Sequence, residues 1–199
     1  KIVIKRSEIV QDNASERKIE IPYHDSLRYI SPAFETAIEA AMRRGRMFEI
    51  QWKWIDWDAR MILIPPESQG PANKRAPARL PMSPGLFNTL KQLNGVDDNG
   101  AIKHREGDEA EAAVFGTLAS DRAYRLLRLA CHLLGIKDLH WHDLRHEACS
   151  RLAEADWTIQ QIQVVSGHKT LQSLQRYMHI RPETIHRLWD RKAQEEAAA

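Results

Sequence analysis

Apolar residues follow a helical period over most of the chain and change to a different period in one short stretch. From Ser31 to position 50, the segment SPAFETAIEAAMRRGRMFEI spaces its apolar residues three and four positions apart, which predicts helix. Ser31 is the expected N-cap, Pro32 fits the first turn, and Gly45 is expected to divide the segment into two helices. The aromatic and branched residues of WKWIDWDARMILI, at 52–64, instead predict a β-hairpin with its turn at 56–60.

The segments that follow extend this mainly helical pattern. Residues 67–77 are rich in Pro, Gly, Gln and Asn and predict a loop, and a short strand is expected at 79–82. The polar and acidic stretch 94–110 is predicted to be a disordered surface loop. Helices are predicted at about 85–93, at 142–155, and from Pro182 to Ala193. A further helix is expected to be capped by Ser120 or Asp121 and ended by Gly135, and two more are expected at 158–165 and 170–180 with Thr158 and Thr170 as N-caps.

The predicted fold class is therefore α+β and mainly α-helical, with a small antiparallel β-sheet near the N-terminal third. Residues 1–25 are mixed and polar, with short strands expected at 1–5 and near 19–22, and they are predicted to be a linker or edge segment. Residues 26–199 are expected to form one domain, since 199 residues can bury one good core.

Composition narrows the class of protein without naming a function. Hydrophobic content of 43% and charged content of 28% are ordinary for a soluble globular protein. The sequence contains no apolar run of the roughly 20 residues that cross a bilayer and no secretory signal at its start, so a cytoplasmic protein without membrane contact is expected. Cys131 and Cys149 both fall in predicted helices, which favours reduced thiols that pack in the core. The first residue is Lys, which suggests a fragment of a longer protein.

Charge is unevenly distributed along the chain although the net charge is only +2. Residues 42–81 carry eight bases against four acids, whereas residues 96–112 carry six acids against two bases. Such clusters either form solvated faces or bind nucleic acid, and both interpretations stay open on charge alone.

The most informative stretch is WHDLRHEACSRLAEADWTIQQIQVVSGHKTLQSLQRY, at 141–177. His142 and Arg145 are three positions apart and therefore share one face of a helix, and Tyr177 follows His168 by nine positions. An arginine fork fits two oxygens of a phosphate, histidines can donate hydrogen bonds or move a proton, and a tyrosine hydroxyl can attack phosphorus. The sequence thus indicates phosphoryl transfer by side chains alone, with no cofactor.

A zinc site is the competing interpretation of one part of this stretch, because His142 and His146 form an HxxxH pair. Arg145 would place a cation beside the metal, and no third ligand is near in the sequence. No metal site is therefore predicted, and His146 is expected to be a buried, hydrogen-bonded residue that supports the site.

The order HxxR, then Gly-His, then Tyr resembles the tyrosine recombinase (phage integrase) family, over about residues 31–189. The family's first box reads approximately T-G-x-R-x-x-E followed by L-x-W-x-x-I-D, and AAMRRGRMFEIQWKWIDW matches it in register. This alignment places Arg43 at the catalytic arginine and Lys74, in NKRAPARLPMS, at the lysine of the family's hairpin. The chain departs from the pattern at three places: Ala40-Ala41 replace T-G, Arg46 replaces the glutamate, and Ser166 replaces the usual Leu before Gly-His.

The resemblance implies a role for each matched residue. The implied catalytic set is Arg43, Lys74, His142, Arg145, His168 and Tyr177. The two arginines would clamp the non-bridging oxygens of a DNA phosphodiester, and His168 would add a hydrogen bond. His142 would assist proton transfer from Tyr177, and Lys74 would protonate the leaving 5′-oxygen. The implied product is a 3′-phosphotyrosyl link, which a 5′-hydroxyl can resolve without ATP or metal.

The implied function is site-specific DNA recombination or integration by a phage or mobile-element enzyme. Double-stranded DNA is the implied partner, with a tetrameric synapse that depends on DNA and a free fragment that is mainly monomeric. The implied location is the bacterial cytoplasm, with association to the nucleoid, and a separate N-terminal core-binding domain is expected to lie outside this chain. The last helix, with Ile185, Leu188 and Trp189 on one stripe, is expected to dock on a neighbouring protomer or loosely on its own domain.

Two other functions fit parts of the sequence. TIQQIQVVSGHKTLQSLQRY also scans as a helix-turn-helix with Gly167 in the turn, which would suit a non-catalytic DNA-binding regulator but leaves Arg43 and Lys74 without a role. A type IB topoisomerase-like enzyme would share the chemistry but not the exchange between duplexes. A covalent adduct between Tyr177 and DNA separates the enzymes from the regulator, and recombinant product separates the two enzymes.

Overall fold

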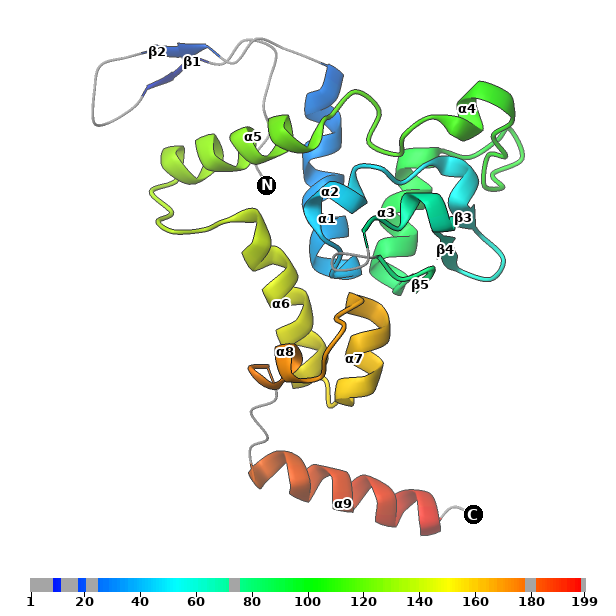
Figure 1. Ribbon diagram of the computed structural model, residues 1–199, viewed down its shortest axis with the longest axis vertical. Helices are drawn as coiled ribbons and strands as arrows, with labels where there is room; N and C mark the ends of the chain where they lie inside the picture. The colour runs from blue at the N-terminus through cyan, green and yellow to red at the C-terminus, as the bar shows by residue number, and fades with distance from the viewer. Residues whose placement is uncertain (1–8, 12–17, 21–24, 72–75, 178–181, 198–199) are drawn as a thin grey trace.

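Helix α1 (Ile30–Ala40) lies at the centre of the molecule and packs against α3 (Pro84–Asn94) and α6 (Trp141–Glu154) (Figure 1). This computed structural model describes residues 9–11, 18–20, 25–71, 76–177 and 182–197. The small residues Ala33, Ala37 and Ala40 are fully buried on α1, so both neighbouring helices can approach its backbone closely. The described chain is mainly helical with a small antiparallel sheet, which confirms the predicted α+β class.

The break after α1 comes earlier than predicted. Ala41 has a left-handed backbone (φ 49°) and ends α1, whereas Gly45 lies inside the next helix, α2 (Arg44–Met47). The predicted N-cap was also wrong, since Tyr29, at the end of the 3₁₀ turn η1 (Asp25–Tyr29), precedes the helix and Ser31 lies within it. Glycine usually marks such a break, but here a tertiary hydrogen bond to the Ala41 carbonyl stabilises the turn.

A three-stranded antiparallel sheet follows, with strand order β3 (Ile55–Asp56), β4 (Met61–Leu63), β5 (Arg79–Pro81). Ile55 pairs with Ile62, and Ile62 pairs with Leu80, so the buried side chains of the three strands line up on one face. The hairpin is confirmed, although Trp52–Trp54 forms a 3₁₀ turn (η2) rather than strand. The loop after β4 begins with the 3₁₀ turn η3 (Pro66–Ser68), and its residues 72–75 lie outside the described chain.

A second, two-stranded antiparallel sheet joins β1 (Ile9–Gln11) to β2 (Lys18–Glu20). Strand β2 agrees with the strand expected near 19–22, and β1 was not predicted. The strand expected at 1–5 lies outside the described residues.

The acidic stretch 94–110 is ordered, so the prediction of disorder was wrong. Asn94 is buried, its amide donates to the Lys103 carbonyl at 2.7 Å, and its side-chain oxygen accepts from Arg105 Nε at 2.6 Å. The Asp97 carboxylate accepts hydrogen bonds from two backbone amides of its own turn, and Lys103 pairs with Glu109 on α4 (Gly107–Glu111). Polar side chains here satisfy backbone groups locally, which composition alone does not reveal.

The C-terminal half is helical, as predicted. It contains α5 (Ser120–Leu133), α6, α7 (Ile159–Ser166), α8 (Gln172–Gln175) and α9 (Pro182–Ala197). Thr158 caps α7 with a reciprocal bond from Gln161, and Gly135 follows α5 with φ +67°, both as predicted. Helix α8 is much shorter than expected and its N-cap is Leu171 rather than Thr170, while residues 178–180 lie outside the described chain.

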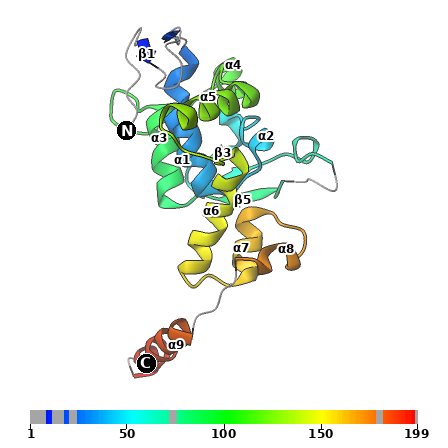
Figure 2. The ribbon, with the colours of Figure 1, turned by 90° about the vertical axis from the view of Figure 1, so that its left-hand side faces the viewer.

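Helices α6, α7 and α8 lie together on one side of α1 and the sheet, as both ribbon views show (Figures 1 and 2). Helix α9 stands apart from the rest of the molecule in these views. Cys131 and Cys149 are buried and free, which confirms their predicted packing role. Among the described residues, no helix is long and apolar enough to cross a membrane.

Candidate active site

The start of α6 is anchored by aromatic packing, which positions the functional side chains of this helix. Trp141 is buried, and its ring centroid lies 5.1 Å from that of Phe34 on α1 and 5.6 Å from that of Phe48 after α2. The Asp143 carboxylate accepts a hydrogen bond from the His140 backbone amide at 2.7 Å and caps the helix. One turn of α6 is thereby held against both elements that flank the predicted arginine box.

Arg145 is the buried cation of the site, with only 3% of its surface exposed. Its Nη1 donates to the Ala41 carbonyl at 2.5 Å, and its Nη2 lies 3.1 Å from the ring nitrogens of His168. Burial, and then the nearby charge of Arg43, lower the pKa of Arg145 to about 10. The guanidinium therefore stays protonated at neutral pH, and it has further N–H groups that can donate to an anion.

Arg43 is the arginine of the first box whose charge acts on this cluster. It precedes α2 with an extended backbone (φ −69°, ψ 138°). Burial is the main cause that lowers the pKa of Arg145, His142 and His168, and the charge of Arg43 adds to this effect at each of them. Arg44 is engaged elsewhere, because it pairs with Asp121 at 3.2 Å on α5 and lies over the Tyr124 ring. The geometry thus supports the register that assigns Arg43, rather than Arg44, to the site.

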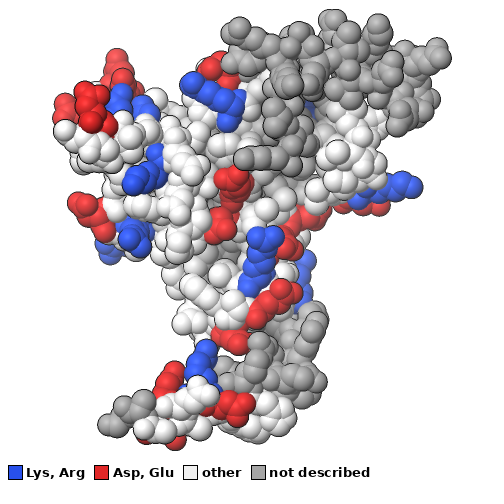
Figure 3. Space-filling model, turned by 180° about the vertical axis from the view of Figure 1, so that it is seen from behind, with Lys and Arg blue, Asp and Glu red and all other residues white. Residues whose placement is uncertain are grey.

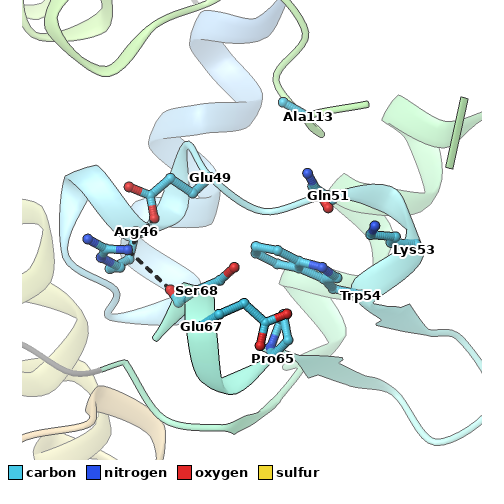
Figure 4. Close-up of a pocket in the computed structure, with 9 residues that line it drawn as sticks. All are labelled: Arg46, Glu49, Gln51, Lys53, Trp54, Pro65, Glu67, Ser68 and Ala113. Carbon is cyan, nitrogen blue, oxygen red and sulfur yellow. Dashed lines mark hydrogen bonds and ion pairs between the residues drawn. The ribbon is translucent and has the colours of Figure 1, made fainter. Parts of the chain in front are cut away.

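Arg46, which replaces the glutamate of the family pattern, does not contact Arg43 in the interactions described. Its Nη1 donates to the Glu49 carboxylate at 2.5 Å and to the Ser68 carbonyl at 3.1 Å, and its guanidinium packs against Gly70. Arg46 therefore ties α2 to the loop after β4 (Figure 4).

A cavity of about 490 Å³ opens beside Arg46 (Figure 4). Its lining comes from the region of α2, the hairpin and the loop after it, and comprises Arg46, Glu49, Gln51, Lys53, Trp54, Pro65, Glu67, Ser68 and Ala113. These residues carry charges of both signs and include no predicted catalytic residue. None of the residues predicted to bind phosphate therefore lines this cavity. On the face seen from behind Figure 1, acidic and basic side chains are interspersed over the described residues (Figure 3).

His168 projects from the turn that ends α7. Its Nδ1 lies 2.7 Å from the buried Ser166 hydroxyl, and its backbone carbonyl accepts from Gln163 Nε2 at 2.9 Å. Burial, followed by the charges of Arg145 and Arg43, lowers the pKa of His168 to about 4. The imidazole is therefore neutral near pH 7, so one ring nitrogen can accept from Arg145 while the other donates.

Gly167 makes this turn possible. Its backbone is left-handed (φ +64°), and a Cβ at this position would lie 2.8 Å from Pro77 Cδ. The close contact brings the turn before His168 against the segment that follows the loop of Lys74. Lys74 itself falls on residues 72–75, outside the described chain, so its place in the site stays a prediction.

Tyr177 lies just after α8, and its hydroxyl forms a hydrogen bond with Nδ1 of His146. The two ring centroids are 5.6 Å apart, and the His142 ring packs edge-on against His146 at 4.5 Å. The family resemblance implied proton transfer by His142, and His146 was expected only to support the site. The structure puts His146 in contact with the Tyr177 hydroxyl, whereas the His142 ring contacts the His146 ring.

The surroundings of Tyr177 keep it protonated. Burial, and then the thiol of Cys149, raise the pKa of its hydroxyl, while Arg176 and Arg145 act in the opposite direction. A phenol with a raised pKa is a weak nucleophile until a base removes its proton.

The structure brings five of the six predicted site residues into one cluster: Arg43, His142, Arg145, His168 and Tyr177. Two further residues contact this cluster: His146, which was expected only to support the site, and Ser166, which was noted only as a departure from the family's Leu. The spacing of four between His142 and His146 was the available signal for the first, and the departure from Leu was the signal for the second. The arrangement combines fixed cations, neutral imidazoles and a hydroxyl, which is suited to phosphoryl transfer.

The fold is a helical body with a small sheet that carries an Arg–His–Arg–His–Tyr cluster. Sequence comparison identifies the family. Residues 14–184 match the phage integrase family, and the chain belongs to it. Among curated proteins, it is 29% identical over 170 residues to the shufflon-specific DNA recombinase of Escherichia coli, which covers 85% of this chain and 39% of that protein. It is 26% identical over 155 residues to the integrase of Salmonella phage P22, covering 76% of this chain and 39% of that integrase. The chain thus spans about two fifths of these relatives' length.

Solved structures agree on the fold. The Tn1549 transposon integrase in complex with transposon right-end DNA superposes with a TM-score of 0.58 at 15% identity, over 85% of this chain and 60% of that one. The XerA recombinase superposes with a TM-score of 0.51 at 14% identity, over 84% of this chain and 61% of the other. At these identities the likeness establishes the fold alone.

Proposed function

We propose that this chain is the catalytic portion of a site-specific DNA recombinase, which cleaves and rejoins strands through a 3′-phosphotyrosyl intermediate. Residues 26–199 would form the catalytic domain. The observation that carries the proposal is the buried Arg145, which is held by the Ala41 carbonyl and lies against His168 in the cluster that contains Tyr177. A buried, fixed arginine with several diverging donors is a preorganised site for a phosphodiester.

The reaction follows from the charges of the cluster. Arg145 and Arg43 bind the two non-bridging oxygens and stabilise the extra negative charge of the pentavalent transition state. The Tyr177 oxygen forms a bond to phosphorus as the bond from phosphorus to the 5′-oxygen breaks. Lys74 supplies a proton to the departing oxygen, and His168 adds a hydrogen bond to the phosphate. The phosphotyrosine conserves the bond energy, so a 5′-hydroxyl of another strand rejoins without ATP.

Double-stranded DNA is the proposed partner, in an assembly that depends on DNA. Relatives of known structure support this: one is the λ integrase dimer bound to a core site, and another is the XerH recombinase bound to its difH substrate. A tetrameric synapse would bring two duplexes together for exchange. The enzyme would act in the cytoplasm of a bacterial host, on nucleoid or mobile-element DNA.

The two rival functions fit the geometry less well. In a helix-turn-helix regulator the helix after Gly167 would enter the major groove, but α8 has only four residues. That function also leaves the buried Arg145 without a purpose. A type IB topoisomerase would use the same cluster, so only strand exchange between duplexes separates it from a recombinase.

The decisive experiment traps the covalent intermediate. A pool of nicked duplexes with a randomised central sequence is incubated with the chain at low salt, and protein–DNA adducts that survive denaturation are counted. The native chain should form an adduct, while Tyr177→Phe should form none and still bind the DNA, because only a hydroxyl is removed. Tyr124→Phe is the matched control, since Tyr124 lies beside Arg44 and away from the cluster. An adduct on Tyr177→Phe, or none with the native chain, contradicts the proposal.

A further inference from the structure

His146 stands in direct contact with the proposed nucleophile. It follows Arg145 on α6, and its Nδ1 forms a hydrogen bond with the Tyr177 hydroxyl. The two rings are tilted by 41° with their centroids 5.6 Å apart, so the contact places nitrogen and oxygen together rather than stacking the rings face to face. The His142 ring packs edge-on against the His146 ring.

We propose that His146 is the base that removes the Tyr177 proton during strand cleavage, which rests on the proposed function above. As the Tyr177 oxygen bonds to phosphorus, its proton moves to Nδ1 of His146, and the electron pair of the breaking bond leaves on the 5′-oxygen. That oxygen takes a separate proton from Lys74. In the rejoining step the proton moves in the opposite direction, and His146 returns it to the departing tyrosine oxygen.

The other histidines of the cluster are less suited to this task. Both sides of the His168 ring are occupied, since Ser166 lies 2.7 Å from its Nδ1 and the Arg145 guanidinium lies 3.1 Å from the ring nitrogens. His142 reaches His146 rather than Tyr177. Contact with the proton that must be moved comes first in choosing a base, and His146 has it.

The protonation state of His146 fits the role. Burial lowers its pKa first, followed by the positive charge of Arg176, with Arg145 acting in the same direction and Asp143 against it. The ring is therefore neutral near pH 7 and can accept a proton, whereas Tyr177, with its raised pKa, cannot lose one unaided. General-base assistance of this kind contributes about 10²–10⁴ to a rate.

The test compares His146→Asn with the native chain on two substrates. Asparagine can place an oxygen near the position of Nδ1 and keep the hydrogen bond, but it cannot take a proton. One substrate is the ordinary nicked duplex pool, and the other carries sulfur in place of the bridging 5′-oxygen, whose thiolate leaves without a proton. His146→Asn should reduce the cleavage rate by about 10²–10⁴ on both substrates. Lys74→Ala should cleave the ordinary duplex slowly and the sulfur-containing duplex at nearly the native rate.

Controls separate this role from folding and from the parent proposal. His104→Asn changes an exposed histidine in the stretch 94–110, outside the cluster, and this variant should cleave at the native rate. Equal thermal unfolding and DNA affinity of native chain and His146→Asn exclude a structural cause. The native cleavage rate should rise with pH through the His146 titration, which Arg145, Arg176, Asp143, His142 and Tyr177 all influence, whereas the variant should rise only in the alkaline range of tyrosine.

Three outcomes overturn the inference. Cleavage by His146→Asn within twofold of native shows that no base acts there. Rescue of His146→Asn by the sulfur substrate assigns His146 to the leaving group instead. An unchanged pH profile indicates a structural role. In each case the native chain still forms its adduct, so the proposed recombinase activity stands independently, and it fails only if the native chain forms none.

Discussion

At the scale of single residues, the proposed function requires Arg145 to donate hydrogen bonds to three partners with one side chain. Two of its nitrogens already contact the Ala41 carbonyl and the His168 ring, and the proposed phosphate is the third partner. A guanidinium can do this because its donors diverge in one plane, whereas the single ammonium of lysine cannot reach all three.

Arg145→Lys should therefore lower the rate of adduct formation by about 10²–10³. It should also destabilise the fold by about 1–3 kcal/mol, because the buried Ala41 carbonyl loses its donor. Single-turnover cleavage and urea unfolding measure the two effects. Arg44→Lys is the control and should change the cleavage rate only slightly. If Arg44→Lys slowed cleavage more than Arg43→Lys, the register of the first box would be wrong.

His168 makes stability depend on pH. Its pKa is about 4 in the folded chain, below the usual 6.5, so between these values the unfolded chain binds more protons than the folded one. The contribution is fully present above about pH 6.5 and is lost as the pH falls toward 4. The melting temperature should decrease through this window, and less so in His168→Gln. Identical pH profiles for the two proteins would refute the prediction.

At the scale of elements, the end of α7 connects the His168 turn to the sheet region. Gly167 has φ +64°, and Pro77 occupies the space where a side chain would begin. Gly167→Ala should destabilise the chain by about 1–3 kcal/mol and slow cleavage, because both the backbone and Pro77 must shift.

Gly45 supplies the matched control for that substitution. It lies inside α2, and a Cβ added there would meet no other atom within 4 Å, so Gly45→Ala should be neutral or stabilise by up to about 1 kcal/mol. Thermal unfolding of both variants provides the comparison. Equal losses at the two glycines would show that the contact with Pro77 is unimportant.

At the scale of the whole molecule, α9 is the helix whose role depends on contacts outside the rest of the described chain. It stands apart from the body in Figure 1, and Trp189 is 63% exposed, touching the His186 ring within its own helix. A large exposed aromatic on a detached helix suits contact with a second protomer.

Trp189→Ala should leave the melting temperature of the free chain nearly unchanged, because the side chain buries little in the monomer. It should weaken assembly on DNA and lower recombination. Sedimentation of the free chain should show a monomer, since a few apolar side chains do not offset the loss of translational and rotational freedom. A stable dimer at micromolar concentration, or full recombination by the variant, would contradict this picture.

Local chemistry explains what could be predicted from the sequence by itself. Helical periods, the Thr158 cap and the hairpin at 55–63 depend on neighbouring residues, so their patterns are visible in the chain. The order HxxR, Gly-His and Tyr likewise reflects chemistry that needs those residue types, and it indicated both the family and most of the cluster.

Tertiary contacts decided the rest. The turn at Ala41 is stabilised by Arg145, 104 positions later in the chain, so it has no local signal. The order of 94–110 depends on hydrogen bonds of the buried Asn94 within that stretch, which its polar composition does not reveal. Which of His142 and His146 contacts Tyr177 depends on where the short α8 places the tyrosine. Spacing along one helix shows which residues share a face, but only packing between helices determines which of them contacts Tyr177.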